Sequence, residues 1–213
     1  MLLTLNEKDY YIPQKWTEVT LGSYQKFMDV TSDDLDEHTN NMNGISALLG
    51  VPLEILEKCK KTDIDQITEA VTKLSSIKVN TTLNLIIEVN GKKFGFHPKL
   101  KDITFGEFVD LDNYLTKPLE NLHYIMAVLY REVTFEKKGK YSIVDYDTAK
   151  CAANADMFKD NLSIATVNGA LGFFLNIGKE YLMITQSYFK KKNKMKNTKQ
   201  QSSSLVENGV GTV

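Results

Sequence analysis

Cysteine is scarce in this sequence: among 213 residues there are two, Cys59 and Cys151, which lie far apart and form no C-x-x-C pair. This spacing argues against a disulfide framework and a clustered zinc site, and it suits a reducing compartment. Net charge is nearly absent as well, with a formal value of −1 at pH 7. The chain as a whole therefore lacks the excess positive charge that attracts nucleic acid or an anionic membrane.

Long hydrophobic runs are also missing. The stretch between Asp160 and Lys179 carries no charged residue, but it contains three asparagines and three glycines. It barely reaches the ~18 residues that a membrane crossing requires. We therefore expect a buried helix there rather than a membrane span. The N-terminus lacks the basic segment and the apolar run of a signal peptide, so we expect no secretion signal.

Catalytic motifs are sparse. The sequence contains no Gly-rich phosphate loop, no H-E-x-x-H and no G-x-S-x-G, and His38, His97 and His123 lie in unrelated contexts. We therefore predict that the protein is not an enzyme and uses no cofactor or metal. The enzyme alternative requires a pocket in which His97 or His123 meets the acidic residues Asp102, Glu107, Asp110 and Asp112. A divalent-cation site is the other chemical role of this acidic group, but we favour helix-dipole compensation and a solvated face.

A six-residue phrase occurs twice: VTLGSY at Val19–Tyr24 and ITFGEF at Ile103–Phe108. Each copy follows an aromatic-rich stretch that ends in proline. In the second copy, the Thr104 hydroxyl is placed to cap a helix while the Glu107 side chain reaches back to the backbone N–H of Thr104, which is a capping box. The first copy keeps the threonine but has Ser23 in place of the glutamate. Both phrases therefore predict helix starts.

The pattern predicts an α+β fold that is predominantly helical with two or three short β-hairpins. It favours an internal duplication of a strand–proline–capped-helix–helix module, with halves at about 1–80 and 81–189. We expect residues 1–189 to form a single globular domain, and 190–213 to be a disordered basic and polar tail.

The expected elements follow from periodicity, caps and turn signals. We expect hairpins over 2–12, 83–96 and 133–144, the second turning at Asn90-Gly91, and helices over Thr20–Val30, His38–Leu49, Pro52–Lys60, Asp63–Ser76, Thr104–Tyr114, Pro118–Tyr130, Thr148–Met157 and Leu162–Phe189. Within the helix Thr104–Tyr114, one face carries Phe105, Phe108, Val109 and Asp112.

Small residues form a separate strip on the last expected helix, at Ala165, Gly169 and Gly172. Each internal glycine costs about 1 kcal/mol of helix propensity. We therefore expect another backbone to pack closely against this strip, from the same chain or from a partner, or else a kink. These three residues are the predicted partner-binding site, and a homo-oligomer is one use of them.

The basic run Lys190–Lys196 is the one place where positive charge gathers. Aromatic residues that could stack on bases are not interleaved with its lysines. We favour a solvated helix end, where lysines complement the helix dipole, over a nucleic-acid contact.

Three segments resemble parts of small proteins of tailed bacteriophages. They are Gly95–Asp112, Asn121–Arg131 and Leu162–Leu175, and together they cover most of the chain after Leu83. Such proteins are associated with tail genes and with the tail-assembly-chaperone type. The resembling motifs are structural rather than catalytic, and they identify no ligand residues.

The resemblance implies a non-enzymatic protein that binds the tape-measure or tail-tube protein during virion assembly, in the host cytoplasm. A permanent virion component, such as a neck, connector or tail-ring protein, is the alternative. That alternative implies a symmetric homo-oligomer built partly on Ala165, Gly169 and Gly172.

Overall fold

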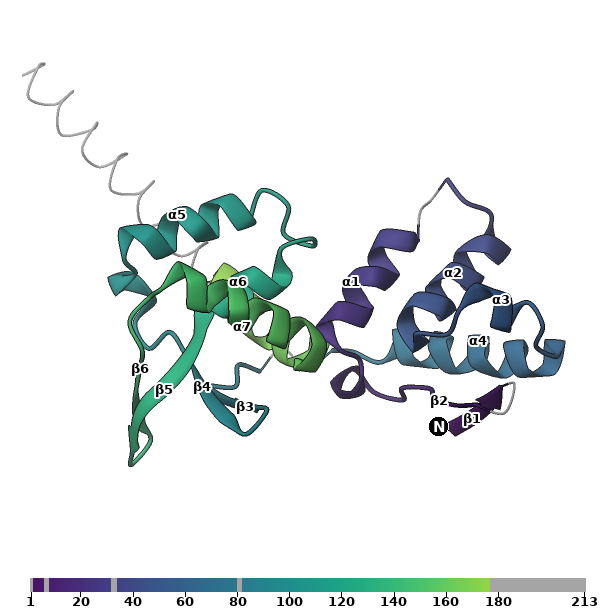
Figure 1. Ribbon diagram of the computed structural model, residues 1–213, viewed down its shortest axis with the longest axis horizontal. Helices are drawn as coiled ribbons and strands as arrows, with labels where there is room; N and C mark the ends of the chain where they lie inside the picture. The colour runs from purple at the N-terminus through teal and green to yellow at the C-terminus, as the bar shows by residue number, and fades with distance from the viewer. Residues whose placement is uncertain (1, 6–7, 32–33, 80–81, 177–213) are drawn as a thin grey trace, which may run out of the picture. The chain divides into compact units, whose positions relative to one another are not determined.

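The computed structural model describes residues 2–5, 8–31, 34–79 and 82–176 of the chain (Figure 1). Met1–Leu171 forms one compact unit, and the described residues 172–176 belong to a second unit. The part of the predicted last helix beyond residue 176 and the predicted tail over 190–213 lie outside the described residues.

The fold is α+β, as predicted, with the elements in the order drawn in Figure 1. The strands are β1 (Leu2–Leu5), β2 (Lys8–Tyr11), β3 (Ile86–Val89), β4 (Lys92–Phe96), β5 (Tyr130–Lys137) and β6 (Lys140–Ile143). The helices are α1 (Leu21–Val30), α2 (Glu37–Leu49), α3 (Leu53–Leu56), α4 (Lys61–Ser76), α5 (Phe105–Tyr114), α6 (Leu122–Leu129) and α7 (Thr148–Asn161), with 3-10 turns η1 (Trp16–Glu18) and η2 (Leu100–Asp102). Residues 164–176 are helical as well.

The strands form two antiparallel sheets, β1-β2 and β3-β4-β5-β6. All three predicted hairpins are confirmed. Asn90 and Gly91 turn the second one with φ of 50° and 74°, and Lys138 and Gly139 turn the third with the same two angles. Two successive residues of positive φ are the signature of the two-residue turn that matches strand twist. The β4–β5 pairing, which joins these two hairpins into one sheet, is not local in sequence.

The same order of elements occurs twice along the chain. Hairpin, 3-10 turn, threonine cap and ten-residue helix follow one another from β1 to α1 and again from β3 to α5 (Figure 1). The separation is 84 residues throughout: β1 and β3 begin at 2 and 86, η1 and η2 at 16 and 100, and α1 and α5 at 21 and 105. We call these the first and the second module.

The first module packs against α2 and α4. Its buried cluster combines hairpin residues with apolar residues of the helices: Leu5, Tyr10, Ile12, Ile45, Val51, Leu56 and Ile67. Gly50 ends α2 with a φ of 64°, the left-handed conformation that glycine adopts without a steric penalty.

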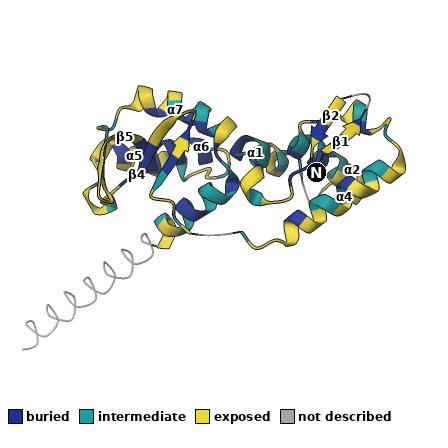
Figure 2. Cartoon of the chain, turned by 90° about the horizontal axis from the view of Figure 1, so that it is seen from below, coloured by how far each residue is buried: buried dark blue, intermediate teal, exposed yellow. Residues whose placement is uncertain are grey.

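The second module packs against α6 and α7. Most of α6 is buried, and it lies against the strands of the larger sheet (Figure 2). Phe94 of β4 meets Phe158 of α7 edge to face, with ring centroids 5.0 Å apart, and Phe96 meets Tyr130 in the same way at 5.3 Å. Such edge-to-face aromatic pairs add about 0.5–1.5 kcal/mol beyond the burial of their area.

Two predicted helix starts are wrong. Helix α4 begins at Lys61 with no side-chain cap, so Asp63, where the helix is expected to start, lies within its first turn. Helix α6 begins at Leu122 rather than Pro118, because the chain remains in turns until Asn121, whose side chain donates to the Tyr114 carbonyl.

The predicted close approach at Gly169 is confirmed, and the approaching backbone belongs to the same chain. A Cβ at Gly169 would lie 2.3 Å from the carbonyl oxygen of Thr82. Gly169 is buried, whereas Ala165 and Gly172 are half-buried. The predicted partner-binding role of Ala165, Gly169 and Gly172 stays a prediction. Among the described helices, none is both long enough and apolar enough to cross a membrane.

Candidate functional site

Helix α5 starts with the capping box that the sequence predicts. The Thr104 hydroxyl accepts the backbone N–H of Glu107 at 3.3 Å, and the Glu107 carboxylate accepts the backbone N–H of Thr104 at 2.7 Å. The same carboxylate oxygen also accepts the Thr104 hydroxyl at 2.6 Å. These bonds satisfy donors that a helix start leaves free, so they fix where α5 begins and how it is rotated.

The other carboxylate oxygen of Glu107 points into the protein. It lies 2.8 Å from Nη2 of Arg131 in β5 and 3.5 Å from Nε2 of His97 after β4. All three side chains are buried, and Glu107 is completely covered. We call His97, Glu107 and Arg131 the anchor cluster, because it ties the first turn of α5 to two strands of the sheet.

The contacts of the His97 ring are those of a neutral imidazole. Its Nδ1 accepts the backbone N–H of Lys99 at 3.3 Å, which assigns the ring proton to Nε2, facing Glu107. Burial lowers the pKa of His97, the Glu107 carboxylate opposes that shift, and Arg131 adds to it. The cluster therefore holds one negative and one positive charge, with a neutral ring beside them.

The Glu107–Arg131 contact is close but not aligned. The nitrogen and oxygen lie 2.8 Å apart, yet Oε1 of Glu107 and Nε of Arg131 have no hydrogen bond of good geometry. Coulomb attraction depends on separation rather than on the N–H angle, so the two charges still stabilise each other. A buried pair of this kind gives little net stability, but losing one partner leaves the other charge buried and uncompensated.

The anchor cluster leaves the apolar face of α5 in solvent. Phe105 is 81% exposed, Phe108 is 55% exposed and Val109 is 36% exposed. These residues share one helix face by their spacing, whereas Glu107 and Leu111 are buried on the other. An amphipathic helix normally buries its aromatic residues. The exposed Phe105, Phe108 and Val109 therefore make this face the candidate interaction site.

A cavity of about 240 Å³ opens beside the anchor cluster. Arg131, Tyr146 and Cys151 are among the residues that line it, but His97 and Glu107 are not. Burial raises the pKa of the Cys151 thiol to about 11, so the thiol is protonated at neutral pH and is a weak nucleophile. The structure thus brings His97 to Glu107, as the enzyme alternative requires, but encloses both away from this cavity.

The four acidic residues near α5 do not converge. Glu107 faces inward, Asp110 accepts the Tyr146 hydroxyl, and Asp102 lies 3.8 Å from Lys99 at the surface. Asp112 is exposed. Among the residues that the structure describes, no three His, Cys, Asp or Glu side chains are placed to hold a metal ion.

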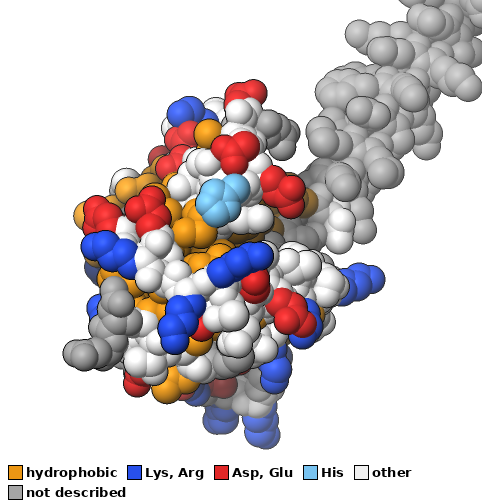
Figure 3. Space-filling model, turned by 90° about the vertical axis from the view of Figure 1, so that its right-hand side faces the viewer, with side chains coloured by type: hydrophobic (Ala, Val, Ile, Leu, Met, Phe, Trp, Pro, Cys, Tyr) orange, Lys and Arg blue, Asp and Glu red, His pale blue; other side chains and the backbone are white. Residues whose placement is uncertain are grey.

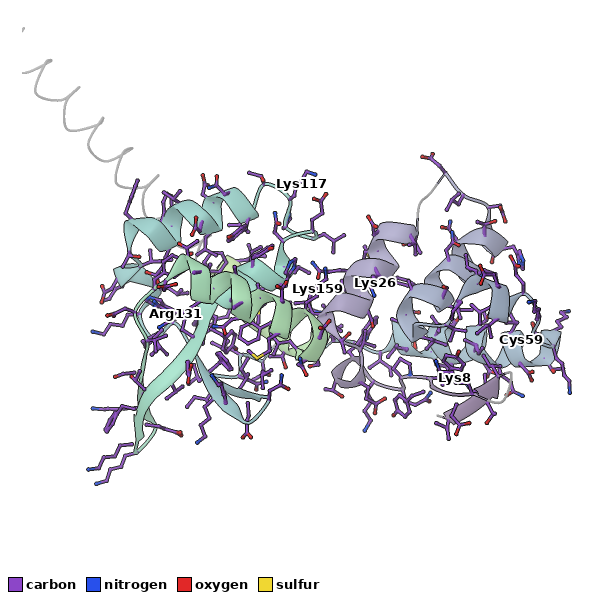
Figure 4. The ribbon with its side chains drawn as sticks, in the orientation of Figure 1. Lys8, Lys26, Cys59, Lys117, Arg131 and Lys159 are labelled. Atoms are coloured by element: carbon purple, nitrogen blue, oxygen red, sulfur yellow. The ribbon has the colours of Figure 1, made fainter. Side chains whose placement is uncertain are left out.

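A second hollow of about 490 Å³ lies where α1 meets the 117–120 turn and α7. Lys26, Lys117 and Lys159 reach it from these three segments (Figure 4). Gln25 also lines it and crosslinks its wall, donating to the carbonyls of Leu119 and Glu120 at 2.7 and 2.9 Å. Lys117 is paired with Glu120 at 3.0 Å, so the charge in the hollow is partly balanced.

Elsewhere on the surface, charges of both signs are mixed. The face in Figure 3, seen from the side of α3 and α4, shows acidic and basic side chains interspersed around small hydrophobic areas. This mixture is typical of a solvated protein surface.

No protein-family model, curated protein sequence or solved structure matches the chain.

Part of this site can be predicted from the amino-acid sequence. The repeated phrase identifies the cap, and helical spacing places Phe105, Phe108 and Val109 together. Arg131 is missed, because the β4–β5 pairing that brings it to Glu107 leaves no local signal. The two charged residues Arg131 and Glu132, between the apolar residues Tyr130 and Val133, are the only local sign of it in the sequence.

Proposed function

We propose that the protein is non-enzymatic and binds another protein through the outward face of α5, defined by Phe105, Phe108 and Val109. The observation that carries this proposal is that α5 buries a charged residue and exposes an aromatic one: Glu107 is fully buried, whereas Phe105 is 81% exposed. Aromatic residues are enriched at the centres of protein interfaces, where they contribute much of the binding energy.

The resemblance to tailed-bacteriophage proteins suggests the partner. We propose a role of the tail-assembly-chaperone type, in which this face binds the tape-measure or tail-tube protein in the host cytoplasm. A chaperone of this type requires an apolar surface that remains available in the free protein, and the α5 face has that property. A permanent virion component with the same face is the second candidate.

Affinity capture with the tape-measure protein tests the proposal. The full chain, co-expressed with that protein, is compared with the double variant Phe105→Ser/Phe108→Ser. We expect the wild type to capture the tape-measure protein and the double variant to lose it, since hot-spot aromatics contribute about 2 kcal/mol or more each. Phe135→Ser is the matched control, because Phe135 of β5 is 56% exposed, close to the value for Phe108.

Equal capture by the double variant and the wild type would contradict use of the α5 face. Mass spectrometry of purified virions separates the two candidate roles. A chaperone is present in the infected cell and absent from the particle, whereas a neck or ring component is present in both.

A further inference from the structure

The first module shows what covers the start of its helix. Val19–Leu21 pairs antiparallel with Leu162–Ile164, the extended segment that follows α7. The Leu21 N–H donates to the Leu162 carbonyl at 2.7 Å, and the Ile164 N–H donates to the Val19 carbonyl at 2.9 Å. Leu21, whose N–H makes the first of these bonds, is 0% exposed. The end of α7 lies beside the start of α1 (Figure 1).

Gly22 permits this contact. A Cβ at Gly22 would lie 2.9 Å from the backbone oxygen of Lys159, in the last turn of α7. Real Cβ atoms essentially never approach backbone that closely. The glycine of the VTLGSY phrase therefore makes room for the end of another helix.

Among the residues that the structure describes, none covers the corresponding edge of the second module. Ile103–Phe105 corresponds to Val19–Leu21 in the 84-residue repeat. In the described part of the chain, the N–H of Phe105 and the carbonyl of Ile103 have no hydrogen-bond partner. Their counterparts in the first module are both paired, and where Leu21 is 0% exposed, Phe105 is 81% exposed.

Gly106 corresponds to Gly22 but has no steric role within the described residues. The nearest atoms to a Cβ at Gly106 belong to the Tyr146 ring, at 3.8 and 3.9 Å, which is ordinary van der Waals contact. Glycine is generally less favourable in a helix than alanine. No contact among the described residues requires a glycine at this position of α5, which is the place where the first module receives another backbone.

We infer that the second module binds, in trans, a segment of another protein with the chemistry of Leu162–Ile164. That segment follows the end of a helix, runs extended, and has an apolar–polar–apolar pattern. It pairs antiparallel with Ile103–Phe105, and its apolar side chains cover Phe105 and Phe108 while its helix end approaches Gly106. Strand addition of this kind combines backbone hydrogen bonds with side-chain pockets.

A second copy of the chain does not supply this segment, because its own Leu162–Ile164 is already used in its first module. This inference rests on the proposed function, because both place the partner on the outward face of α5. To the proposed function it adds the chemistry of the partner segment and a role for Gly106.

Selection from a surface-displayed library of random 16-residue peptides tests the inference on the full chain. We expect enrichment of peptides with a helix-forming half followed by an apolar–polar–apolar segment. We expect Gly106→Ala to bind them about tenfold more weakly or worse, because the added carbon overpacks the contact with the helix end of the peptide. Asn113→Ala is the control, since Asn113 is exposed in the last turn of the same helix. It should bind as the wild type does.

Three results would overturn the inference. The first is equal binding of the selected peptides to the wild type and to Gly106→Ala. The second is a dimer of the full chain that disappears in Gly106→Ala, and the third is an intramolecular crosslink from Phe105→p-benzoylphenylalanine to residues 177–213.

The thermal stability of Gly106→Ala is the control, because an unchanged value shows that a loss of binding is not caused by unfolding. Capture of the tape-measure protein that depends on Phe105 but not on Gly106 would support the proposed function and contradict this inference. Binding of the selected peptides without capture of the tape-measure protein would support this inference and contradict the proposed function.

Discussion

Glu107 shows how one residue can set the surface of the molecule. Its carboxylate completes the cap of α5 with one oxygen and meets Arg131 and His97 with the other. Because this polar side chain is fixed inward, the helix turns Phe105 outward. The anchor cluster thus connects a local capping motif to the exposed surface that we propose as the binding site.

Glu107→Gln tests the anchor cluster. The amide keeps the size of the side chain but removes the charge that compensates Arg131. We expect the free energy of unfolding to fall by about 3–5 kcal/mol, the usual effect of leaving a buried charge unpaired. Chemical denaturation measures it. Glu69→Gln, which removes an exposed pair with Lys73, is the control and should leave stability unchanged within error. A loss no larger than that of the control would show that the cluster does not anchor α5.

The two buried histidines predict a pH dependence. The pKa values of His97 and His123 are both lowered, chiefly by burial, from the ordinary value of 6.5. Because the unfolded chain takes up these protons more readily than the folded protein does, their contribution is present above pH 6.5 and is lost as the pH falls below it. We expect the stability measured in urea to decrease between pH 7 and pH 5. His97→Gln and His123→Gln should each reduce that slope, and an unchanged slope in both would refute the assignment.

At the scale of elements, helix starts and hairpin turns could be predicted from the sequence where a cap or a turn requires particular residues. Thr20 and Thr104 mark helix starts because their hydroxyls accept free backbone N–H groups, and Asn90-Gly91 turns a hairpin because both residues adopt positive φ. The error at α4 has a physical reason as well. Asp63 lies in the first turn, where a carboxylate complements the helix dipole without being the cap.

Long-range pairing could not be predicted in this way. The sequence indicates a strand over Val133–Phe135, but β5 begins at Tyr130 because it pairs with β4. That pairing brings Arg131 to Glu107. Helical spacing alone would also suggest the wrong buried face for α5, because the aromatic face of a helix is normally the inner one. The orientation depends on partners in β4 and β5.

The two modules predict opposite effects for the same substitution. Gly22→Ala places a carbon 2.9 Å from a backbone oxygen and should lower the free energy of unfolding by about 1–3 kcal/mol. Gly106→Ala has room for its carbon and should leave stability unchanged or raise it by up to about 1 kcal/mol. Thermal unfolding of both variants, side by side, measures the contrast. Equal destabilisation of the two would mean that Gly106 has an intramolecular steric role.

At the scale of the whole molecule, the described residues form a scaffold that presents one apolar helix face. The formal net charge is small, and the face in Figure 3 mixes charges of both signs. The binding that we propose therefore uses apolar contact and backbone pairing at the second module. The first module makes the same kind of contact within the chain, which is the reason to expect it between chains.

Amide hydrogen exchange of the full-length protein, with and without a saturating amount of the tape-measure protein, tests the central claim most directly. The account predicts that exchange over 104–108 slows about tenfold or more in the complex, since the partner covers Phe105 and pairs with its N–H. Exchange over α4 should remain unchanged. Protection confined to other segments, with 104–108 exchanging as in the free protein, would contradict the account.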